Sequence, residues 1–68
     1  MEKVVALMSR FVEKVNEARA ANEYAKACEY LDMLCGAMCA FNEYEIGNRR
    51  QVTLGEVNRR VFIEVKEF

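Results

Sequence analysis

The chain contains no histidine, no proline and no tryptophan. Histidine is the commonest general base and the commonest metal ligand near neutral pH, so its absence removes the usual chemistry of hydrolytic and metal-dependent enzymes. The sequence also has no glycine-rich phosphate loop followed by lysine, and no dinucleotide-binding fingerprint. We therefore predict a protein that is not an enzyme and that has no catalytic residue, no cofactor and no metal site.

Glycine is scarce as well, and occurs only at Gly36, Gly47 and Gly55. Most of the chain therefore lacks the residues that tight turns and strand ends require, and this favours helix. Hydrophobic residues make up 53% of the chain and the net charge is -1, a composition typical of a folded globular protein. The 68 residues predict a single domain, 1–68, that is marginally stable unless it associates.

The first residues do not form the compact apolar stretch of a signal peptide, because Glu2, Lys3 and Arg10 interrupt them. The apolar run from Met33 to Phe41 has nine residues. A helix that spans a membrane needs roughly 20. The three cysteines cannot all pair within one chain, and this favours free thiols in a reducing compartment. The sequence predicts a cytoplasmic protein without contact with a membrane.

Apolar residues recur at helical spacing and predict a helix over about 2–20, followed by a second helix that ends near residue 46, before Gly47. Asn22 is the natural break between them, although one continuous helix is an alternative because no glycine or proline enforces the break. Both segments have a seam with alternating spacings of four and three, as an antiparallel helical hairpin requires. The seam residues are Val4, Met8, Phe11, Val15 and Ala18, and then Tyr24, Cys28, Leu31, Cys35, Met38 and Asn42.

The last part of the chain fits two structures. Thr53 and Glu56 form a capping box ahead of apolar residues that share one helical face, and this predicts a third helix over about 54–67. The segment 61–68 is also rich in β-branched and aromatic residues, and 51–54 can pair with it as a β-hairpin. We favour the helix, and so predict an all-α fold, a small helical bundle. An α+β fold with a C-terminal β-hairpin is the alternative.

The apolar run in the second helix indicates association. A helix that is apolar all round must be covered on more than one side, and a short chain has few segments to cover it. We predict an association patch on the second helix and a homodimer or larger symmetric oligomer. The alternative is that the third helix covers these residues. The candidate interface residues are Tyr30, Met33, Ala37 and Phe41.

The second helix also carries all three cysteines, Cys28, Cys35 and Cys39, on nearly the same face. A structural zinc ion takes four ligands, so another chain would have to supply the rest. We interpret the cysteines as small apolar core residues, because free cysteine is among the most buried residue types. Asn42 lies on the same seam, where a buried asparagine sets helix register and oligomer state. The alternative for Asn42 is a solvated helix end.

Positive charge gathers in the last third of the chain. Residues 47–68 carry five basic and three acidic side chains, whereas residues 1–46 carry five basic and eight acidic ones. Guanidinium groups beside the free amides of a helix N-terminus favour phosphate or carboxylate. The alternative is a solvated basic loop. The candidate anion-binding residues are Arg49, Arg50, Thr53, Arg59 and Arg60.

Two functions follow from these patterns. The preferred one is a non-enzymatic interaction module that acts as a regulator, adaptor or inhibitor through self-association and through contact with another protein. The alternative is a binder of a phosphorylated small molecule or a nucleic acid through the basic loop.

Overall fold

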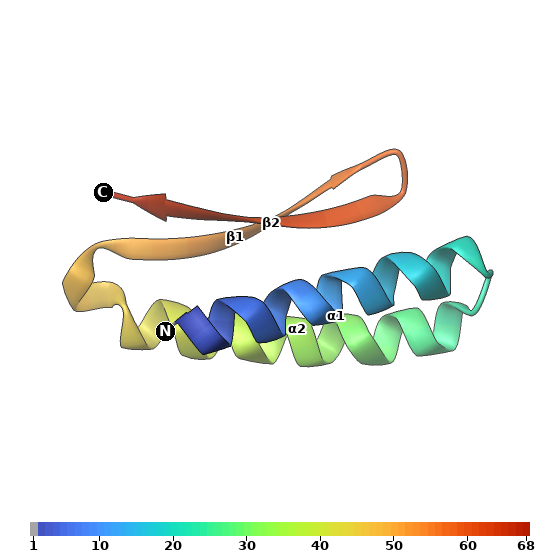
Figure 1. Ribbon diagram of the computed structural model, residues 1–68, viewed down its shortest axis with the longest axis horizontal. Coiled ribbons are helices and arrows are strands. Elements are labelled where there is room, and N and C mark those ends of the chain that lie inside the picture. The colour runs from blue at the N-terminus through green and yellow to red at the C-terminus, as the bar shows by residue number, and fades with distance from the viewer. Residues whose placement is uncertain (1) are drawn as a thin grey trace.

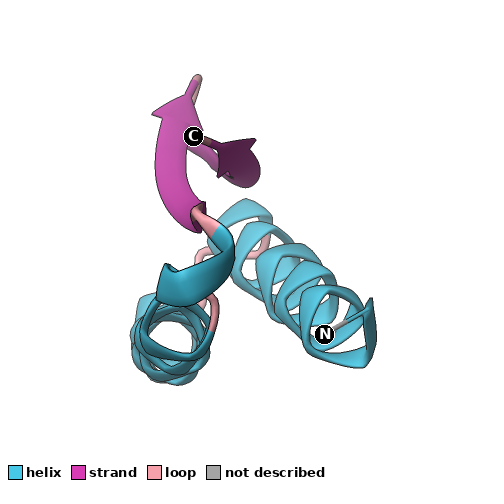
Figure 2. Ribbon diagram, turned by 90° about the vertical axis from the view of Figure 1, so that its left-hand side faces the viewer, coloured by secondary structure: helices cyan, strands magenta, loops and turns pink. Residues whose placement is uncertain are grey.

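The computed structural model describes residues 2–68, which form a helical hairpin followed by a β-hairpin. Helix α1 spans Glu2–Ala20 and helix α2 spans Tyr24–Tyr44. A short 3-10 helix, η1 (Ile46–Asn48), leads into strands β1 (Arg50–Val57) and β2 (Arg60–Glu67). The two helices lie side by side in one layer and the β-hairpin lies over them in a second layer (Figures 1 and 2).

The antiparallel helical hairpin confirms the prediction for the first two thirds of the chain. Asn22, in the link between the helices, has the positive φ of 59° expected of a residue that ends a helix. The predicted seam of α1 is also confirmed, because Met8, Val15 and Ala18 are buried. Val4 and Phe11 are partly buried against the same core.

The predicted seam of α2 is correct at Leu31 and Met38, which pack against the core, but it is wrong by one position at Cys28, Cys35 and Asn42. The buried residues are Ala27, Leu34 and Phe41, which directly precede the predicted seam residues Cys28, Cys35 and Asn42. Both stripes repeat with spacings of four and three, so the spacing alone does not choose between them. At two of the three positions the core selects the larger apolar side chain, Leu34 over Cys35 and Phe41 over Asn42. All three cysteines, Cys39 included, are exposed free thiols, and our interpretation of them as core residues is wrong.

The predicted third helix, 54–67, is wrong, and with it the all-α fold and the helical bundle. Strands β1 and β2 form an antiparallel two-stranded sheet with Val52 opposite Val65 and Leu54 opposite Ile63. The fold is therefore α+β, as in the stated alternative. The β-branched and aromatic residues of both segments outweigh the capping box, because they pair across the strands and pack on the helices.

Gly55 is accommodated in the hairpin by a residue of the partner strand. In the interior of a helix or of a strand, glycine is unfavourable compared with alanine by roughly 0.5–1 kcal/mol. In the hairpin, Gly55 lies opposite Phe62, whose ring occupies the space that a Cβ on Gly55 would take. The Phe62 ring thus packs directly on the backbone of Gly55 on the outer face of the sheet, where any larger residue would block it.

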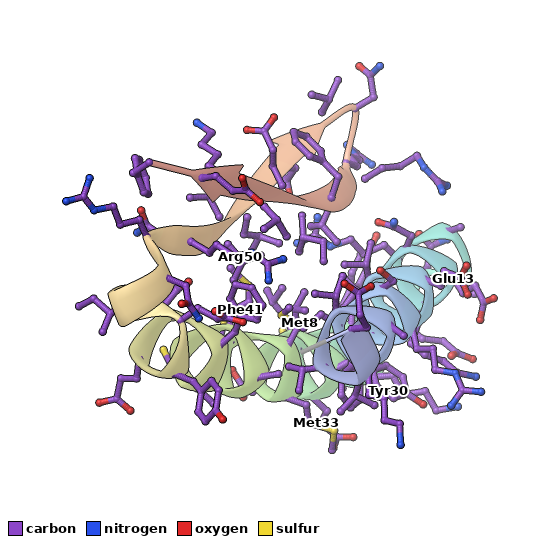
Figure 3. The ribbon with its side chains drawn as sticks, turned by 60° about the vertical axis from the view of Figure 1, so that its left-hand side comes forward. Met8, Glu13, Tyr30, Met33, Phe41 and Arg50 are labelled. Carbon is purple, nitrogen blue, oxygen red and sulfur yellow. The ribbon has the colours of Figure 1, made fainter. Side chains whose placement is uncertain are left out.

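The core lies between the two layers. Met8 of α1, Leu34 and Phe41 of α2 and Val52 of β1 form the buried cluster. Ile63 and Val65 of β2, together with partly buried residues of both helices, pack against it. Figure 3 shows Met8 and Phe41 between the helices and the hairpin. This shared core holds the hairpin at a defined place on the helices.

Two asparagines dock the hairpin, one from each helix. The Asn16 side chain accepts from Val61 N–H at 2.7 Å and donates to the Val61 carbonyl at 3.0 Å. Asn42 contacts Val52 in the same way, at 2.8 and 3.3 Å. Each asparagine therefore satisfies both backbone groups of one strand residue.

The register explains this arrangement. The two-residue turn makes Val57 and Arg60 a hydrogen-bonded pair, so alternate pairs, which include Val52 and Val61, direct their backbone groups away from the partner strand. The asparagines occupy those outward positions. Asn42 is thus neither a helix–helix register residue nor a solvated helix end.

Candidate functional site

The hairpin turn places two arginines at one end of the molecule. Val57 and Arg60 close a two-residue turn of Asn58 and Arg59, whose φ angles are 53° and 66°. Positive φ at both central residues defines a type I′ turn, the type that matches the twist of the flanking strands. This turn lies over the C-terminal half of α1 (Figure 1). Arg59 and Arg60 therefore come to the same end as the link between the helices.

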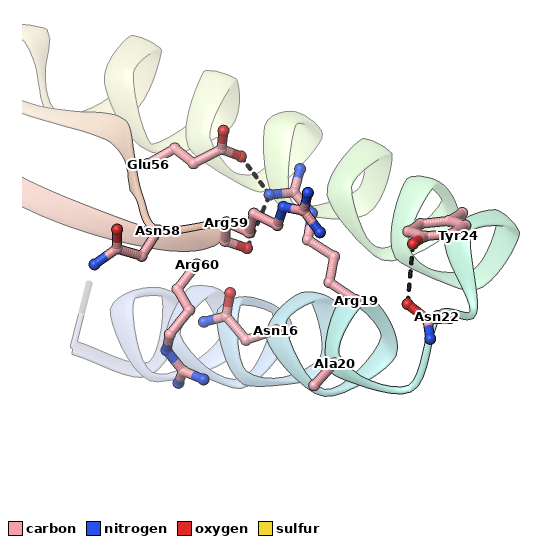
Figure 4. A pocket seen from close by; sticks show the side chains of 9 residues that line it. All are labelled: Asn16, Arg19, Ala20, Asn22, Tyr24, Glu56, Asn58, Arg59 and Arg60. Carbon is pink, nitrogen blue, oxygen red and sulfur yellow. Dashed lines mark hydrogen bonds and ion pairs between the residues drawn. The ribbon is translucent and has the colours of Figure 1, made fainter.

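Arg19 joins α1 to the turn. Its Nη1 forms a short hydrogen-bonded ion pair with the Glu56 carboxylate and donates to the Arg59 carbonyl at 3.3 Å. The Arg59 contact uses the backbone, so the Arg59 guanidinium is not involved in it. Figure 4 shows Arg19 reaching from α1 to the turn, with the Arg59 side chain extending into the same region.

Asn16 fixes the height of the strand above α1. It is 7% exposed and holds both backbone groups of Val61, the residue after Arg60. A buried side-chain amide that is fully paired with a backbone has one orientation. The position of Arg60 relative to α1 is therefore set by a contact one residue away.

The link between the helices forms the other side of the site. The Tyr24 hydroxyl donates to Asn22 Oδ1 at 2.9 Å. Tyr24 is 61% exposed, so its ring is accessible while its hydroxyl is anchored. Figure 4 shows both residues at the far end of the site from the hairpin turn.

These groups surround a cleft of about 620 Å³, here named the tip cleft. The helices and their link line it with Asn16, Arg19, Ala20, Asn22 and Tyr24. The hairpin lines it with Glu56, Asn58, Arg59 and Arg60. Three arginines face one glutamate, although the whole chain has a net charge of -1. Within residues 2–68, Arg59 and Arg60 form no ion pair.

The structure divides the predicted anion-binding residues between two places. Arg59 and Arg60 line the tip cleft, whereas Arg49 and Arg50 lie at the other end of the hairpin beside a smaller cleft of about 250 Å³. Thr53 lies within β1 and lines neither cleft. The helix N-terminus that was expected to complete the site does not form, because Thr53 belongs to a strand.

The sequence interpretation missed Arg19, Asn22, Tyr24 and Asn58. Arg19 and Tyr24 belong to helices whose sequence pattern draws attention to apolar residues and cysteines. The turn residue Asn58 carried the one usable signal, because asparagine is favoured at the first central position of a type I′ turn. That signal is meaningful only if the flanking residues are read as strands.

The four candidate interface residues do not form one surface. Phe41 is fully buried in the core, and Ala37 is partly buried against it. Met33 is 54% exposed, and Figure 3 shows Met33 and Tyr30 on the side of the helices away from the hairpin. Phe41 is therefore not available to a partner, while Met33 and part of Tyr30 are.

Two further findings concern absent features. Among the described residues, no group of three or more histidine, cysteine, aspartate or glutamate side chains is arranged to hold a metal ion. Neither helix in residues 2–68 has the length and apolar character needed to cross a membrane.

Comparison with known proteins found no matching family model, no similar curated sequence and no similar solved structure. The function must therefore be argued from the chemistry of the site itself.

Proposed function

We propose that this protein is a non-catalytic binding module that holds a phosphate-bearing ligand in the tip cleft. The observation that carries the proposal is the position of Arg59 and Arg60. They line an open cleft together with Arg19, and no carboxylate in residues 2–68 pairs with either of them.

The chemistry of the cleft suits phosphate. Guanidinium groups present a planar fork of donors that matches the oxygens of phosphate, and charge-assisted bonds of this kind are about twice as strong as neutral ones. Arg19 is held by Glu56 and the Arg59 carbonyl, so it contributes a fixed charge. Arg59 and Arg60 supply donors that are free to close on a ligand.

The size and the neutral side chains agree with a small ligand. Ligand sites usually enclose about 300–1,000 Å³, and the tip cleft at about 620 Å³ lies within that range. Asn22 and Asn58 add amide groups that can donate to phosphate or to a hydroxyl. Within residues 2–68 no catalytic pair is assembled here, because the cleft contains one carboxylate and that carboxylate binds Arg19.

Titration with pyrophosphate, followed by NMR chemical shifts, tests the proposal. We expect saturable shifts at Asn58, Arg59 and Arg60 that the double variant Arg59→Gln, Arg60→Gln abolishes. The matched control is Arg10→Gln, Arg49→Gln, which removes the same charge from exposed arginines outside the cleft. Binding that weakens equally in both variants reflects net charge only and excludes the site.

A second candidate function, self-association, is supported by a different surface. Leu7 and Met33 each precede a docking asparagine, Asn16 and Asn42, by nine residues. Nine residues are about two and a half helical turns, so each points away from the hairpin. We name this exposed face of the helices, with Tyr30, the underside. Leu7 and Met33 are 45% and 54% exposed, and exposed apolar patches mark protein contacts.

Light scattering at high micromolar concentration tests this second candidate. We expect a dimer or larger species that Met33→Glu converts to a monomer. The control is Ile46→Glu, since Ile46 is 77% exposed but belongs to η1 and not to the helix pair. A monomeric wild-type protein excludes self-association.

A further inference from the structure

Arg59 occupies a backbone position that does not suit it. The second central residue of a type I′ turn is preferably glycine, because a side chain at positive φ meets the backbone. Arg59 has a φ of 66°. Asparagine tolerates this conformation, so Asn22 and Asn58 need no special explanation, whereas arginine is strained there. Arg49 has a similar φ of 55°, so a strained arginine does not by itself mark a site. Arg59 differs from Arg49 because its side chain also lines the tip cleft.

Tyr24 supplies a second and independent observation. It is an exposed aromatic ring that lines the same cleft, at the opposite end from the turn. Its hydroxyl donates to Asn22 Oδ1 at 2.9 Å, and the ring itself stays exposed. A phosphate group has no flat apolar surface that could stack on an aromatic ring. A nucleobase has such a surface, and base–aromatic stacking is a principal source of affinity for unpaired bases.

Resting on the proposed function, we infer that the ligand of the tip cleft is a nucleotide unit. Its phosphate lies on Arg59 and Arg60, and its base stacks on Tyr24. Base-paired duplex would hide the base face, so the base is unpaired. A free mononucleotide and a single strand of nucleic acid share this chemistry, and both are covered by the inference.

The ligand comparison separates this inference from the proposed function. AMP and ribose 5-phosphate carry the same phosphate, and only AMP carries a base. We expect AMP to bind about tenfold more tightly, a difference within the range of one base stacked on an aromatic ring. Equal affinity for both compounds overturns the nucleotide inference and leaves phosphate binding in place. Absence of binding by both overturns both proposals.

The Tyr24→Leu variant locates the base. Leucine keeps helix propensity and apolar character but has no ring face. We expect AMP affinity to fall about tenfold, to the level of ribose 5-phosphate, while ribose 5-phosphate binds as before. An AMP preference that survives in Tyr24→Leu overturns the assignment of Tyr24.

An eight-residue oligothymidylate, compared with TMP, identifies the source of the nucleotide unit. Tighter binding of the strand indicates nucleic acid, and equal binding per site indicates a free nucleotide. Either result supports the inference.

The Arg59→Gly variant tests whether the strain serves the side chain. Glycine relieves the turn and keeps the carbonyl that Arg19 contacts. We expect the melting temperature to rise by about 3 °C while AMP affinity falls at least about tenfold. The matched control is Arg49→Gly, since Arg49 has a similar φ of 55° and lies outside the tip cleft. That variant is expected to gain stability with unchanged AMP binding. Full AMP affinity in Arg59→Gly overturns the role of Arg59.

Discussion

The two ends of the β-hairpin each carry a pair of adjacent arginines in different surroundings. At the start of β1, the Arg50 guanidinium contacts the nearly buried Glu45 carboxylate at 3.4 Å and lies 5.4 Å from the centre of the Phe41 ring. Glu45 is 3% exposed. At the turn, Arg59 and Arg60 face an open cleft. Arg50 is therefore part of the structure, whereas the turn arginines are available to a ligand.

This difference teaches that a pair of basic residues becomes a site only through its neighbours. Glu45 also accepts a hydrogen bond from the Asn48 side chain at 2.7 Å, and its carbonyl receives the amides of Asn48 and Arg50. Glu45 therefore holds the segment that leads into β1 in place, through both its carboxylate and its carbonyl. Among the described residues, Glu56 is the one carboxylate that lines the tip cleft, and it pairs with Arg19. Within residues 2–68, Arg50 is neutralised at one end of the hairpin, whereas neither Arg59 nor Arg60 forms an ion pair at the other.

Removing Arg50 gives the largest expected effect. Arg50→Ala leaves the buried Glu45 carboxylate without its cation, so we expect the free energy of unfolding to fall by about 2–3 kcal/mol. Denaturation with urea measures the loss. The double variant Arg50→Ala, Glu45→Gln is expected to recover part of it, because no charge is then left unpaired. A loss in Arg50→Ala below about 1 kcal/mol contradicts the structural role that we assign to this end.

The docking asparagines give the next largest effect. Asn16→Ala leaves both backbone groups of Val61 without partners, and we expect a loss of about 2 kcal/mol. Asn42 is less buried and one of its bonds is longer, so Asn42→Ala is expected to cost about 1 kcal/mol.

Hydrogen exchange identifies the end that opens in each variant. The Val61 amide is expected to lose protection in Asn16→Ala, and the Val52 amide in Asn42→Ala. If both amides lose protection equally in each variant, the hairpin detaches as one unit and its two ends are not held independently.

The middle of the hairpin gives a smaller effect. Gly55→Ala forces the Phe62 ring off the glycine, and we expect a loss of about 1 kcal/mol, because the ring can move at its outer edge. Gly36→Ala is the control. No atom lies near the Cβ that would be added there, and alanine in a helix is expected to stabilise the protein by roughly 0.5–1 kcal/mol. Thermal unfolding measures the change in stability of both variants. If Gly55→Ala and Gly36→Ala both stabilise or both destabilise the protein, the packing of Phe62 on Gly55 is contradicted.

Arg60→Ala gives the smallest effect on stability. Arg60 is exposed, so we expect a change within about 0.5 kcal/mol, in contrast to Arg50 at the other end. The same urea measurement that is used for Arg50→Ala checks it. A loss comparable to that of Arg50→Ala would mean that the turn arginines are structural and would remove the distinction between the two ends.

The helical hairpin was predictable because its signal is local. The seam of α1 and the break at Asn22 are readable from spacing and from one residue type. In the seam of α2, Leu31 and Met38 were predicted correctly, but Cys28, Cys35 and Asn42 were chosen in place of the residues that precede them. Both stripes along that helix have the same spacing of four and three residues. Only contact with Met8 and Val52 selects the stripe that contains Leu34 and Phe41.

The candidate site was predictable only in part. Arg59 and Arg60 were among the predicted anion-binding residues, but their expected companions Arg49 and Arg50 lie at the other end of the hairpin. A helix over 54–67 would have supported a different grouping. Arg19 was not foreseen, because its partner Glu56 is 37 residues away in the chain and no local pattern links them.

The sequence by itself determined two amphipathic helices and the break between them, because helical periodicity is encoded within a few neighbouring residues. It left residues 50–67 with a helix cap and a strand composition of similar strength. Only the tertiary structure decided for the strand, because Asn16, Asn42 and the core pair with it across the chain. The formation of the hairpin also determines which arginines pair with a carboxylate and which remain open to a ligand, since charge pairing depends on distances in space and not on order in the chain.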